Sequence, residues 1–384
     1  MKDQMAKYSA KLLSERSALG GEIAFAAKDD LLIVDGNLAL AELGGDTLFR
    51  LNSLAIVAAR PSLPFADFLV RRAHATESCI FPNDTETRTF LHDIPFLRRS
   101  EIADNPAPQI AQLLGNRKGV IVEGTGILAN GAVTIEQAYI NYSSVFHSTF
   151  VKYLQDLLDQ GFILPGEEEA FNVFRREWLL SLTAEGLEFT TTLKSKEEIL
   201  AEVERVGRYT IERGLVDSFF GNISAKAGNI IYISQTGASL DELAGCIDPV
   251  PMDNSSTTGI TASSELLAHR RIYEETGTSV ILHGHPKFAV VMSMICGEKG
   301  CGIKDCWKDC PNVRFIGDTP VVAGEIGAGG LAKRVPPVIG GPGKAIVYGH
   351  GVFTIGHNFS EAFQAMVDVE NRCRDEYFRL TGNR

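Results

Sequence analysis

The sequence predicts an α/β fold that occurs twice in tandem. In both halves of the chain, helical stretches follow strand-like apolar runs, and segments of the second half match segments of the first. The clearest pair is GTGILANG at 124–131 and GHGVFTIG at 349–356, which share their glycine pattern. Each follows a short apolar run and precedes a long helical pattern. We therefore expect the same arrangement of strands and helices in each copy.

The two copies are separated by a constant offset of 225 residues. The same offset aligns Pro320 with Pro95, and the segment ILHGHP at 281–286 with IVAARP at 56–61. Unrelated segments would not keep one spacing, so an ancient duplication explains the three matches better than chance does.

The second copy begins with a predicted helix in SKEEILAEVERVGRYTIERGLV. There Ser195 and Glu198 form a capping box ahead of apolar residues at helical spacing. After Gly214 the pattern changes to short β-rich runs with glycine turns, such as NIIYISQTG. We expect two domains, residues 1–190 and residues 191–384.

The composition is that of a folded soluble protein, with 45% hydrophobic and 22% charged residues among 384. The net charge of −11 argues against binding to nucleic acid or to an acidic membrane, because both need a basic face. The first residues lack the apolar core of a signal peptide, and no apolar run approaches the length of a membrane helix. Seven cysteines, an odd number, fit a reducing compartment, so we expect a cytoplasmic protein.

Four of these cysteines lie close together in the segment CGEKGCGIKDCWKDC. Their spacing lacks the paired C-x2-C knuckles of common structural zinc sites. A solvent-facing loop with free thiols is the favoured interpretation, and a second metal site is the alternative. The four residues are Cys296, Cys301, Cys306 and Cys310.

The segment LHGHP places His283 and His285 two residues apart, directly after an apolar run. Residues i and i+2 of a strand point to the same side, so both imidazoles would project together from the end of a strand. Gly284 leaves room between them, and Pro286 ends backbone pairing. This pattern suits two ligands of one metal ion, although two ordinary loop histidines would show the same spacing.

The first copy lacks these candidate ligands. At the common offset, His283 corresponds to Ala58, His285 to Arg60 and His350 to Thr125. If the histidines were only structural, a copy with the same fold should retain some of them. We interpret the first copy as a scaffold without the chemistry.

Five motifs of the second copy identify a family. In chain order they are GLVDSFFGNISAK at 214–226, ISQTGASL at 233–240, ASSELLAH at 262–269, LHGHP at 282–286 and YGHGVFTIG at 348–356. With these motifs, residues 195–384 resemble the class II aldolase/adducin family, which includes zinc-dependent L-fuculose-1-phosphate and L-rhamnulose-1-phosphate aldolases. The resemblance implies a three-layer α/β/α domain with a central, largely antiparallel sheet, duplicated in tandem. The first copy resembles the family only in its later half and would be a degenerate domain.

In that family, two histidines of an HxH motif and a distant histidine bind zinc. The resemblance implies that His283, His285 and His350 hold Zn²⁺ or another divalent metal here. Three imidazoles leave coordination positions open, as a catalytic zinc site requires; three hydrogen-bonded histidines are the alternative. His269 would share a helix face with Glu265, four residues before it. The resemblance gives His269 no metal role, and we expect it to be structural.

Glu265 matches the catalytic carboxylate of the family. Such a carboxylate moves a proton to or from the nucleophilic carbon, while the metal stabilises the enediolate that carbon–carbon cleavage leaves. The alternative is an acidic residue in the first turn of a helix, which the helix dipole favours. Epimerases of the family usually carry aspartate at this place, so the glutamate favours an aldolase, decarboxylase or dehydratase.

A further set of residues matches the phosphate-binding positions of the family. They would supply amide, hydroxyl and backbone N–H donors near the start of a helix, without a lysine. Each alone also fits ordinary turn or cap chemistry. The set comprises Asn222, Thr236, Gly237, Ser263 and Ser264.

The implied function is a zinc-dependent aldolase that cleaves or forms a carbon–carbon bond in a phosphorylated ketose through a metal-bound enediolate. The alternatives are a metal-dependent decarboxylase, dehydratase or epimerase on a similar sugar phosphate, and a non-catalytic adducin-like structural protein. Single-domain relatives form fourfold tetramers with active sites between subunits. A chain with two copies would therefore form a homo-oligomer, a dimer that is a pseudo-tetramer of domains.

Overall fold

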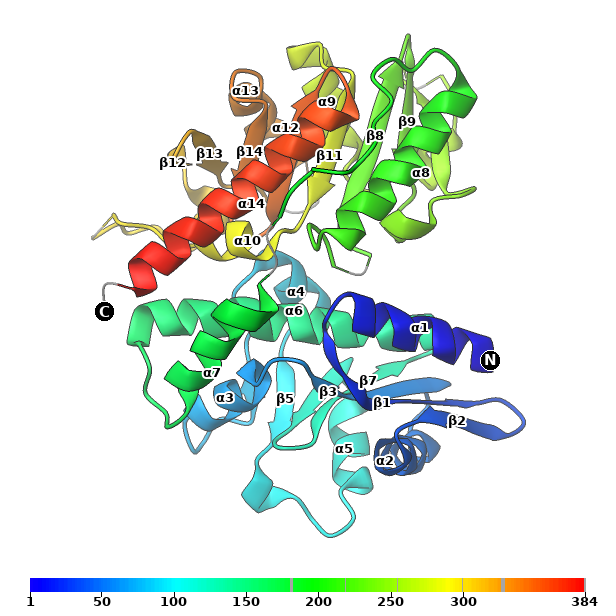
Figure 1. Cartoon of the computed structure of the whole chain (residues 1–384), viewed down its shortest axis with the longest axis vertical. Helices are drawn as coiled ribbons and strands as arrows, with labels where there is room; N and C mark the ends of the chain where they lie inside the picture. Colours follow the sequence, from blue (N-terminus) through cyan, green and yellow to red (C-terminus); the bar gives the residue numbers. More distant parts are fainter. Residues whose placement is uncertain (180–181, 218, 254, 299, 326–328, 383–384) are drawn as a thin grey trace. The chain divides into compact units, whose positions relative to one another are not determined.

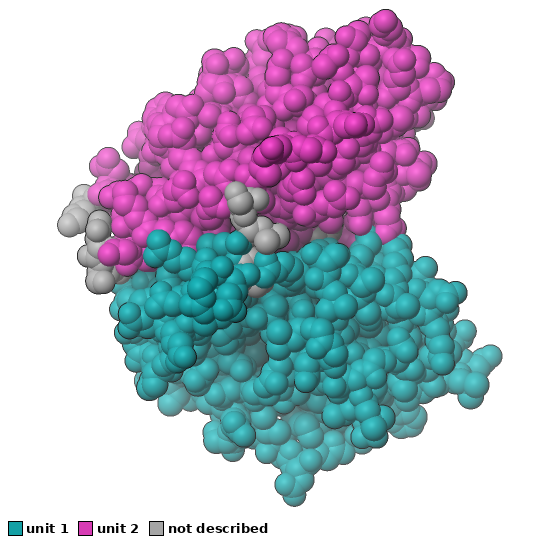
Figure 2. Space-filling model, in the orientation of Figure 1, with its two compact units in different colours: residues 1–83, 87–180 teal, residues 84–86, 181–384 magenta. Residues whose placement is uncertain are grey.

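The computed structural model describes residues 1–384 except 180–181, 218, 254, 299, 326–328 and 383–384 (Figure 1). The chain divides into two compact units, which are coloured separately in Figure 2. Unit 1 comprises residues 1–83 and 87–180, and unit 2 comprises residues 84–86 and 181–384. The short segment 84–86 therefore belongs to unit 2, although it lies within the first copy in the sequence.

Unit 1 contains, in its described residues, a seven-stranded sheet with the order β2-β1-β3-β7-β6-β5-β4. Neighbouring strands are antiparallel except β5 and β6, which are parallel. The strands are β1 (Ala18–Lys28), β2 (Leu32–Gly36), β3 (Ala55–Pro61), β4 (Cys79–Ile80), β5 (Ile94–Leu97), β6 (Gly119–Val122) and β7 (Gly126–Gly131). The helices of the first half are α1 (Lys2–Ser14), α2 (Leu38–Phe49), α3 (Phe65–Arg72), α4 (Thr85–Leu91), α5 (Ala107–Leu114), α6 (Ile135–Gln160) and α7 (Glu167–Val173).

The described part of unit 2 contains an eight-stranded sheet with the order β10-β9-β8-β11-β15-β14-β13-β12. Here the parallel pair is β13 and β14. The strands are β8 (Asn222–Ala227), β9 (Ile230–Ser234), β10 (Ile247–Pro251), β11 (Val280–Gly284), β12 (Arg314–Ile316), β13 (Thr319–Val322), β14 (Lys344–Val347) and β15 (Gly351–Gly356). The helices are α8 (Lys196–Glu212), α9 (Leu266–Thr276), α10 (Lys287–Ser293), α11 (Cys306–Asp309), α12 (Gly330–Arg334), α13 (Pro336–Ile339) and α14 (Phe359–Thr381).

The two sheets repeat one topology, which confirms the predicted tandem duplication. Without its additional edge strand β10, the order of unit 2 matches that of unit 1 strand for strand. The register also agrees, because His283 pairs with Phe353 just as Ala58 pairs with Leu128. Both pairs are related by the offset of 225 residues that was read from the sequence.

Helices cover both faces of each sheet, so the three-layer arrangement is confirmed (Figure 1). In unit 2, one face packs against α9, α12 and α13 through a buried cluster that includes Ile272, Leu331, Ile339 and Phe353. The opposite face packs against α14, which contacts β11 and β15. In unit 1, α2 and α5 cover the corresponding face of the sheet. Apolar side chains on both faces of the strands require this double covering.

The predicted start of α8 is also confirmed. The hydroxyl of Ser195 accepts the backbone N–H of Glu198 at 3.2 Å, and the carboxylate of Glu198 accepts the backbone N–H of Ser195 at 3.3 Å. This reciprocal pair satisfies two of the donors that a helix leaves unpaired at its first turn. Among the described helices, none has the length and apolar character needed to cross a lipid bilayer.

Candidate metal centre and active site

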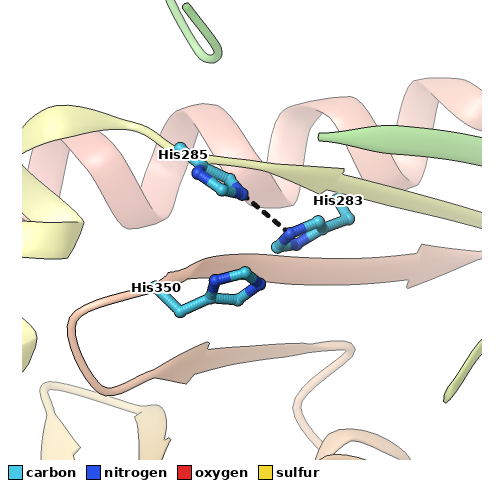
Figure 3. Close-up of side chains that lie close together, drawn as sticks. All are labelled: His283, His285 and His350. Atoms are coloured by element: carbon cyan, nitrogen blue, oxygen red, sulfur yellow. Dashed lines mark hydrogen bonds between the residues drawn. The ribbon is translucent and has the colours of Figure 1, made fainter. Parts of the chain in front are cut away.

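His283 lies on strand β11 and His285 directly follows the end of that strand, and the two imidazoles lie close together, as their spacing predicts (Figure 3). His283 is the cross-strand partner of Phe353, and the two rings stack with centroids 4.0 Å apart. Nδ1 of His283 lies 3.0 Å from the carbonyl oxygen of Val352, to which it donates when it carries the proton. That bond leaves Nε2 of His283 facing Nε2 of His285, at a distance of 3.0 Å.

His350 completes a group of three imidazoles (Figure 3). It lies in the turn between β14 and β15, and β15 neighbours β11 in the sheet. The candidate ligand nitrogens of His283, His285 and His350 all lie within 4.8 Å of one another, and all three residues are buried. Among the described residues, no other group of three His, Cys, Asp or Glu side chains gathers its ligand atoms this closely.

Glu265 contacts two members of this group. It is the N-cap residue of α9, so its carboxylate lies at the beginning of that helix. Oε1 is 2.9 Å from Nε2 of His350, and Oε2 is 3.4 Å from Nε2 of His283. The side-chain amide of Asn222 donates to Oε2 at 2.8 Å. The structure thus brings the predicted catalytic carboxylate and the predicted ligands together at one buried place.

A chain of hydrogen bonds runs from Glu265 into the core. Because Asn222 directs its amide N–H to Glu265, its oxygen faces Nε2 of His269 at 2.5 Å and accepts from it. Nδ1 of His269 must then accept from the hydroxyl of Ser224, at 2.7 Å. The oxygen of Ser224 in turn accepts from the hydroxyl of Tyr273, also at 2.7 Å. Asn222, His269 and Ser224 each accept one of these hydrogen bonds and donate another, so the hydrogen-bond chain orients Glu265 through Asn222.

The hydrogen bonds that His269 makes with Asn222 and Ser224 agree with the structural role that we expect for it from the sequence. His269 is fully buried, and burial lowers its pKa to about 3. The imidazole is therefore neutral at physiological pH, which the hydrogen-bond directions require. Sequence analysis missed Ser224 and Tyr273. Spacing could have indicated them, because Asn222 and Ser224 share one face of a strand, and His269 and Tyr273 share one face of a helix.

The charges in the site are coupled. Burial disfavours the charge of Glu265, but the neighbouring His283 and His350 outweigh it and hold the pKa of Glu265 well below its ordinary value. Burial would also lower the pKa of His350, yet its contacts with Glu265 and Glu86 raise that pKa above its ordinary value. Burial lowers the pKa of His283 to about 4. Two carboxylates thus contact the imidazoles, and a bound cation would take the place of a proton in the charge balance of the site.

The residues present fit a divalent metal ion. A Cβ atom on Gly351 would lie 2.9 Å from Cε1 of His283 and 2.8 Å from Cδ2 of His285, so glycine keeps the space between the rings open. Three imidazole nitrogens with a carboxylate alongside are a donor set that zinc accepts. Phe220 stacks on His285 with ring centroids 5.5 Å apart, which restricts the orientation of that ring.

The predicted phosphate-binding residues come from two loops that the fold brings together. An isolated bridge joins Gln235 to Ala262, and the hydroxyl of Thr236 donates to the carbonyl oxygen of Ala262 at 2.9 Å. Thr236 and Gly237 are exposed, so their remaining polar groups face solvent. The turn after β9 therefore lies beside the segment that leads into α9.

The other members of the predicted phosphate set lie at the beginning of α9 and on β8. Ser264 is exposed, and the hydroxyl of the buried Ser263 accepts the backbone N–H of Glu265 at 3.3 Å. Asn222 is buried, and its side chain is engaged with Glu265 and His269. Asn222 therefore has fewer groups left for an anion than the sequence suggests.

Unit 1 lacks the three imidazoles and the amide of Asn222 at the positions that the common offset and the strand pairing identify. Ala24 pairs with Ala58 as Asn222 pairs with His283, so an alanine occupies the place of the amide. Arg60, at the place of His285, is exposed, and its guanidinium donates to the carbonyl oxygen of Gly124 at 3.2 Å. This side chain binds the turn that corresponds to the His350 turn.

Among the described residues, Cys296, Cys301, Cys306 and Cys310 do not form a group whose ligand atoms lie as close together as those of the three histidines. All seven cysteines of the chain fall within the described residues, and all are free.

The contact between the carboxylate of Glu86 and His350 was not predicted from the sequence. No local pattern in the sequence distinguishes Glu86 from other acidic residues at the start of a helix.

The second half of the chain is similar to known proteins. The family model described as the class II aldolase and adducin N-terminal domain matches residues 201–377. An L-fuculose phosphate aldolase of Methanococcus maripaludis is 26% identical over 168 residues, which cover 43% of this chain and 88% of that protein. The crystal structure of L-fuculose-1-phosphate aldolase from Thermus thermophilus has a TM-score of 0.40 at 21% identity, covering 48% of this chain and 96% of that one.

A relative with another activity also matches. A probable bifunctional methylthioribose-1-phosphate isomerase/methylthioribulose-1-phosphate dehydratase of Nocardia farcinica is 22% identical over 203 residues. The match covers 45% of this chain and 34% of that protein, so the chain spans about a third of its length. The family model covers the histidine group, Glu265 and the two loops beside it. The part of the chain that matches the class II aldolase and adducin N-terminal domain, residues 201–377, is therefore the part that carries these groups.

Proposed function

We propose that the protein is a divalent-metal-dependent carbon–carbon lyase that cleaves or forms a bond in a phosphorylated ketose. The observation that carries this proposal is the buried group of His283, His285 and His350 with Glu265 in contact with two of them. A carboxylate beside a cation site can move a proton at a carbon next to a carbonyl group. The similarity of residues 201–377 to the class II aldolase and adducin N-terminal domain supports the same chemistry.

The three histidines would hold the metal, with zinc as the first candidate. When bound, the cation would act as a Lewis acid that withdraws electrons from a substrate carbonyl. The bond from His283 to the carbonyl oxygen of Val352 directs the Nε2 atom of His283 toward the site. A hydrogen bond from the other ring nitrogen to a backbone carbonyl orients the ring of a ligating histidine. The buried positions of the three rings exclude water from their sides.

Glu265 would accept and return the proton at Oε1. Its other oxygen, Oε2, is held by the amide of Asn222 at 2.8 Å, and the hydrogen-bond chain through His269 holds Asn222 in turn. Oε1 contacts Nε2 of His350, and it would lose that partner when His350 ligates a cation. One oxygen is thus fixed for orientation, and the other becomes available for proton transfer.

The phosphate of the substrate would bind at the two loops near Glu265. The exposed Gly237 and Ser264 would offer backbone and hydroxyl donors beside the first turn of α9, and Thr236 would offer its hydroxyl by releasing the carbonyl oxygen of Ala262. Such donors bind an anion without a lysine, because the positive end of the helix dipole adds to them. Ser263 and Asn222 would support this loop from the buried side.

A dehydratase acting on a sugar phosphate is the second candidate. It is favoured by the dehydratase named among the relatives, which matches 203 residues of this chain. Dehydration and aldol cleavage both use a proton transfer beside a carbonyl, and they differ in the bond that breaks, C–O or C–C. A decarboxylase, an epimerase and a non-catalytic adducin-like protein are the remaining alternatives.

The test is a substrate screen with the full-length protein, loaded with zinc or treated with chelator. Ketose phosphates and sugar-acid phosphates are incubated, and aldehyde release, water loss, carbon dioxide release and epimerisation are scored separately. The proposal expects zinc-dependent aldehyde release from a ketose phosphate. Water loss without aldehyde release would replace the lyase proposal with the dehydratase. No turnover of any compound by zinc-loaded protein would favour the non-catalytic alternative.

We also propose that the chain forms a homodimer in the cytoplasm, a pseudo-tetramer of domains. The matching topologies of the two sheets and the free cysteines support this proposal. Light scattering on the full-length protein measures its mass, for which we expect twice the 41.8 kDa of one chain. A monomer at micromolar concentration would contradict the pseudo-tetramer.

A further inference from the structure

The segment 84–86 binds the turn that carries His350. This segment belongs to unit 2 although it precedes residue 350 by more than 260 positions. The carbonyl oxygen of Gly349 accepts two hydrogen bonds from Thr85, one from the backbone N–H at 2.6 Å and one from the hydroxyl at 2.9 Å. On the other side of the turn, the backbone N–H of Gly349 donates to the hydroxyl of Ser293 at 2.8 Å. Both polar groups of Gly349 are therefore satisfied.

Glu86 contacts the imidazole of the next residue. Its Oε2 lies 3.3 Å from Nδ1 of His350, at ion-pair distance. Nδ1 is buried, and in the described structure it makes no contact with full hydrogen-bond geometry. The opposite nitrogen, Nε2, faces the histidine group and Glu265. The carboxylate of Glu86 is thus placed to receive the N–H of Nδ1.

This arrangement determines which nitrogen of His350 can bind a metal. A neutral imidazole carries its proton on one ring nitrogen and ligates through the other. A carboxylate at Nδ1 keeps the proton there and leaves the lone pair of Nε2 directed into the site. His283 has the same arrangement with a different acceptor, because its Nδ1 faces the carbonyl oxygen of Val352.

The two copies of the domain differ at this turn in an informative way. In unit 1, the carbonyl oxygen of Gly124, which corresponds to Gly349, accepts from the guanidinium of Arg60. The next residue is Thr125, so no imidazole is present to orient. In unit 2, Thr85 binds the turn carbonyl instead, and the neighbouring Glu86 meets the imidazole. The carboxylate is found at the turn that carries the ligand.

We propose that Glu86 is a positioning residue for His350, holding the proton on Nδ1 so that Nε2 is presented to a divalent cation, while Thr85 holds the turn. This inference rests on the proposed metal site, and it extends that site to a segment that sequence comparison with residues 201–377 does not include. Glu86 would act through His350 and would not itself ligate the metal.

The test measures zinc affinity in the full-length protein, by competition with a chromophoric chelator. Glu86→Ala should raise the zinc dissociation constant by about 10- to 100-fold, the usual effect of losing such a partner. Glu86→Gln keeps an acceptor oxygen without the charge and should raise the constant less. The matched control is Glu168→Gln, because Glu168 is also the second residue of a seven-residue helix and is exposed.

A second measurement separates positioning from folding. The thermal midpoint of chelator-treated protein should be equal in the wild type, Glu86→Ala and Glu168→Gln. A lowered midpoint with an unchanged zinc constant would assign Glu86 a structural role and overturn the inference. Wild-type affinity in both Glu86 variants would also overturn it. If the wild-type protein binds no zinc, the proposed metal site fails together with this inference, whereas zinc binding without lyase activity refutes only the proposed reaction.

Discussion

The buried His269 makes a prediction about stability against pH that depends on the hydrogen-bond chain. His269 is completely buried, and its pKa is lowered by burial from 6.5 to about 3. A second proton would require Ser224 to turn its hydroxyl hydrogen away from Nδ1. The unfolded chain accepts this proton near pH 6.5, so it binds more protons than the folded chain does at mildly acidic pH. The stabilising contribution of neutral His269 is therefore present above pH 6.5 and is lost as the pH falls.

The magnitude follows from the linkage between protonation and folding. Between pH 7 and pH 5 the unfolded histidine becomes almost fully protonated, while the folded one stays neutral. A histidine that takes up its proton only in the unfolded chain lowers the free energy of unfolding by about 2 kcal/mol between pH 7 and pH 5. This is a substantial part of the roughly 5–15 kcal/mol that stabilises a typical domain. This loss of unfolding free energy changes little with the pKa of His269 in the folded chain, provided that this pKa stays below about 4.

The assay compares urea unfolding of chelator-treated wild type and His269→Gln at pH 7 and pH 5. Glutamine can still donate to Asn222 but does not titrate, so other groups contribute similarly to both proteins. We expect the wild type to lose about 2 kcal/mol more than the variant over this interval. His269→Asn serves as a second non-titrating variant if glutamine does not fold. Equal losses in the wild type and a folded variant would refute a neutral, buried His269.

Three further predictions concern the metal, the carboxylate and the phosphate. Purified protein should contain about one divalent ion per chain by elemental analysis, and His283→Ala should empty the site; full occupancy after loss of all three histidines would contradict the assignment. Glu265→Gln should lower turnover by about 100-fold or more while metal content stays near that of the wild type, and full activity would leave Glu265 as a helix cap only. Thr236→Val should raise KM for the phosphorylated substrate by about 10-fold with kcat nearly unchanged, and an equal change with the unphosphorylated sugar would argue against a phosphate contact.

Features that depend on local spacing could be predicted from the sequence. The offset of 225 residues is reproduced in the register of both sheets, because paired strands keep their partners when a domain is duplicated. The spacing of His283 and His285 predicted their common direction, since side chains alternate along a strand. The capping box at Ser195 likewise involves only neighbouring residues. The histidine spacing and the capping box can each be recognised within one segment of the sequence, and the offset can be recognised by comparing two segments.

Only the tertiary structure decided which distant groups meet. The amide of Asn222 looked like a phosphate ligand in its motif, but folding places it between Glu265 and His269, where burial requires that its polar atoms be paired. Glu86 looked like an ordinary acidic residue at a helix start, and its contact with His350 depends on a segment that is remote in sequence. Local spacing carries no information about such contacts, because the packing of the whole domain brings the partners together.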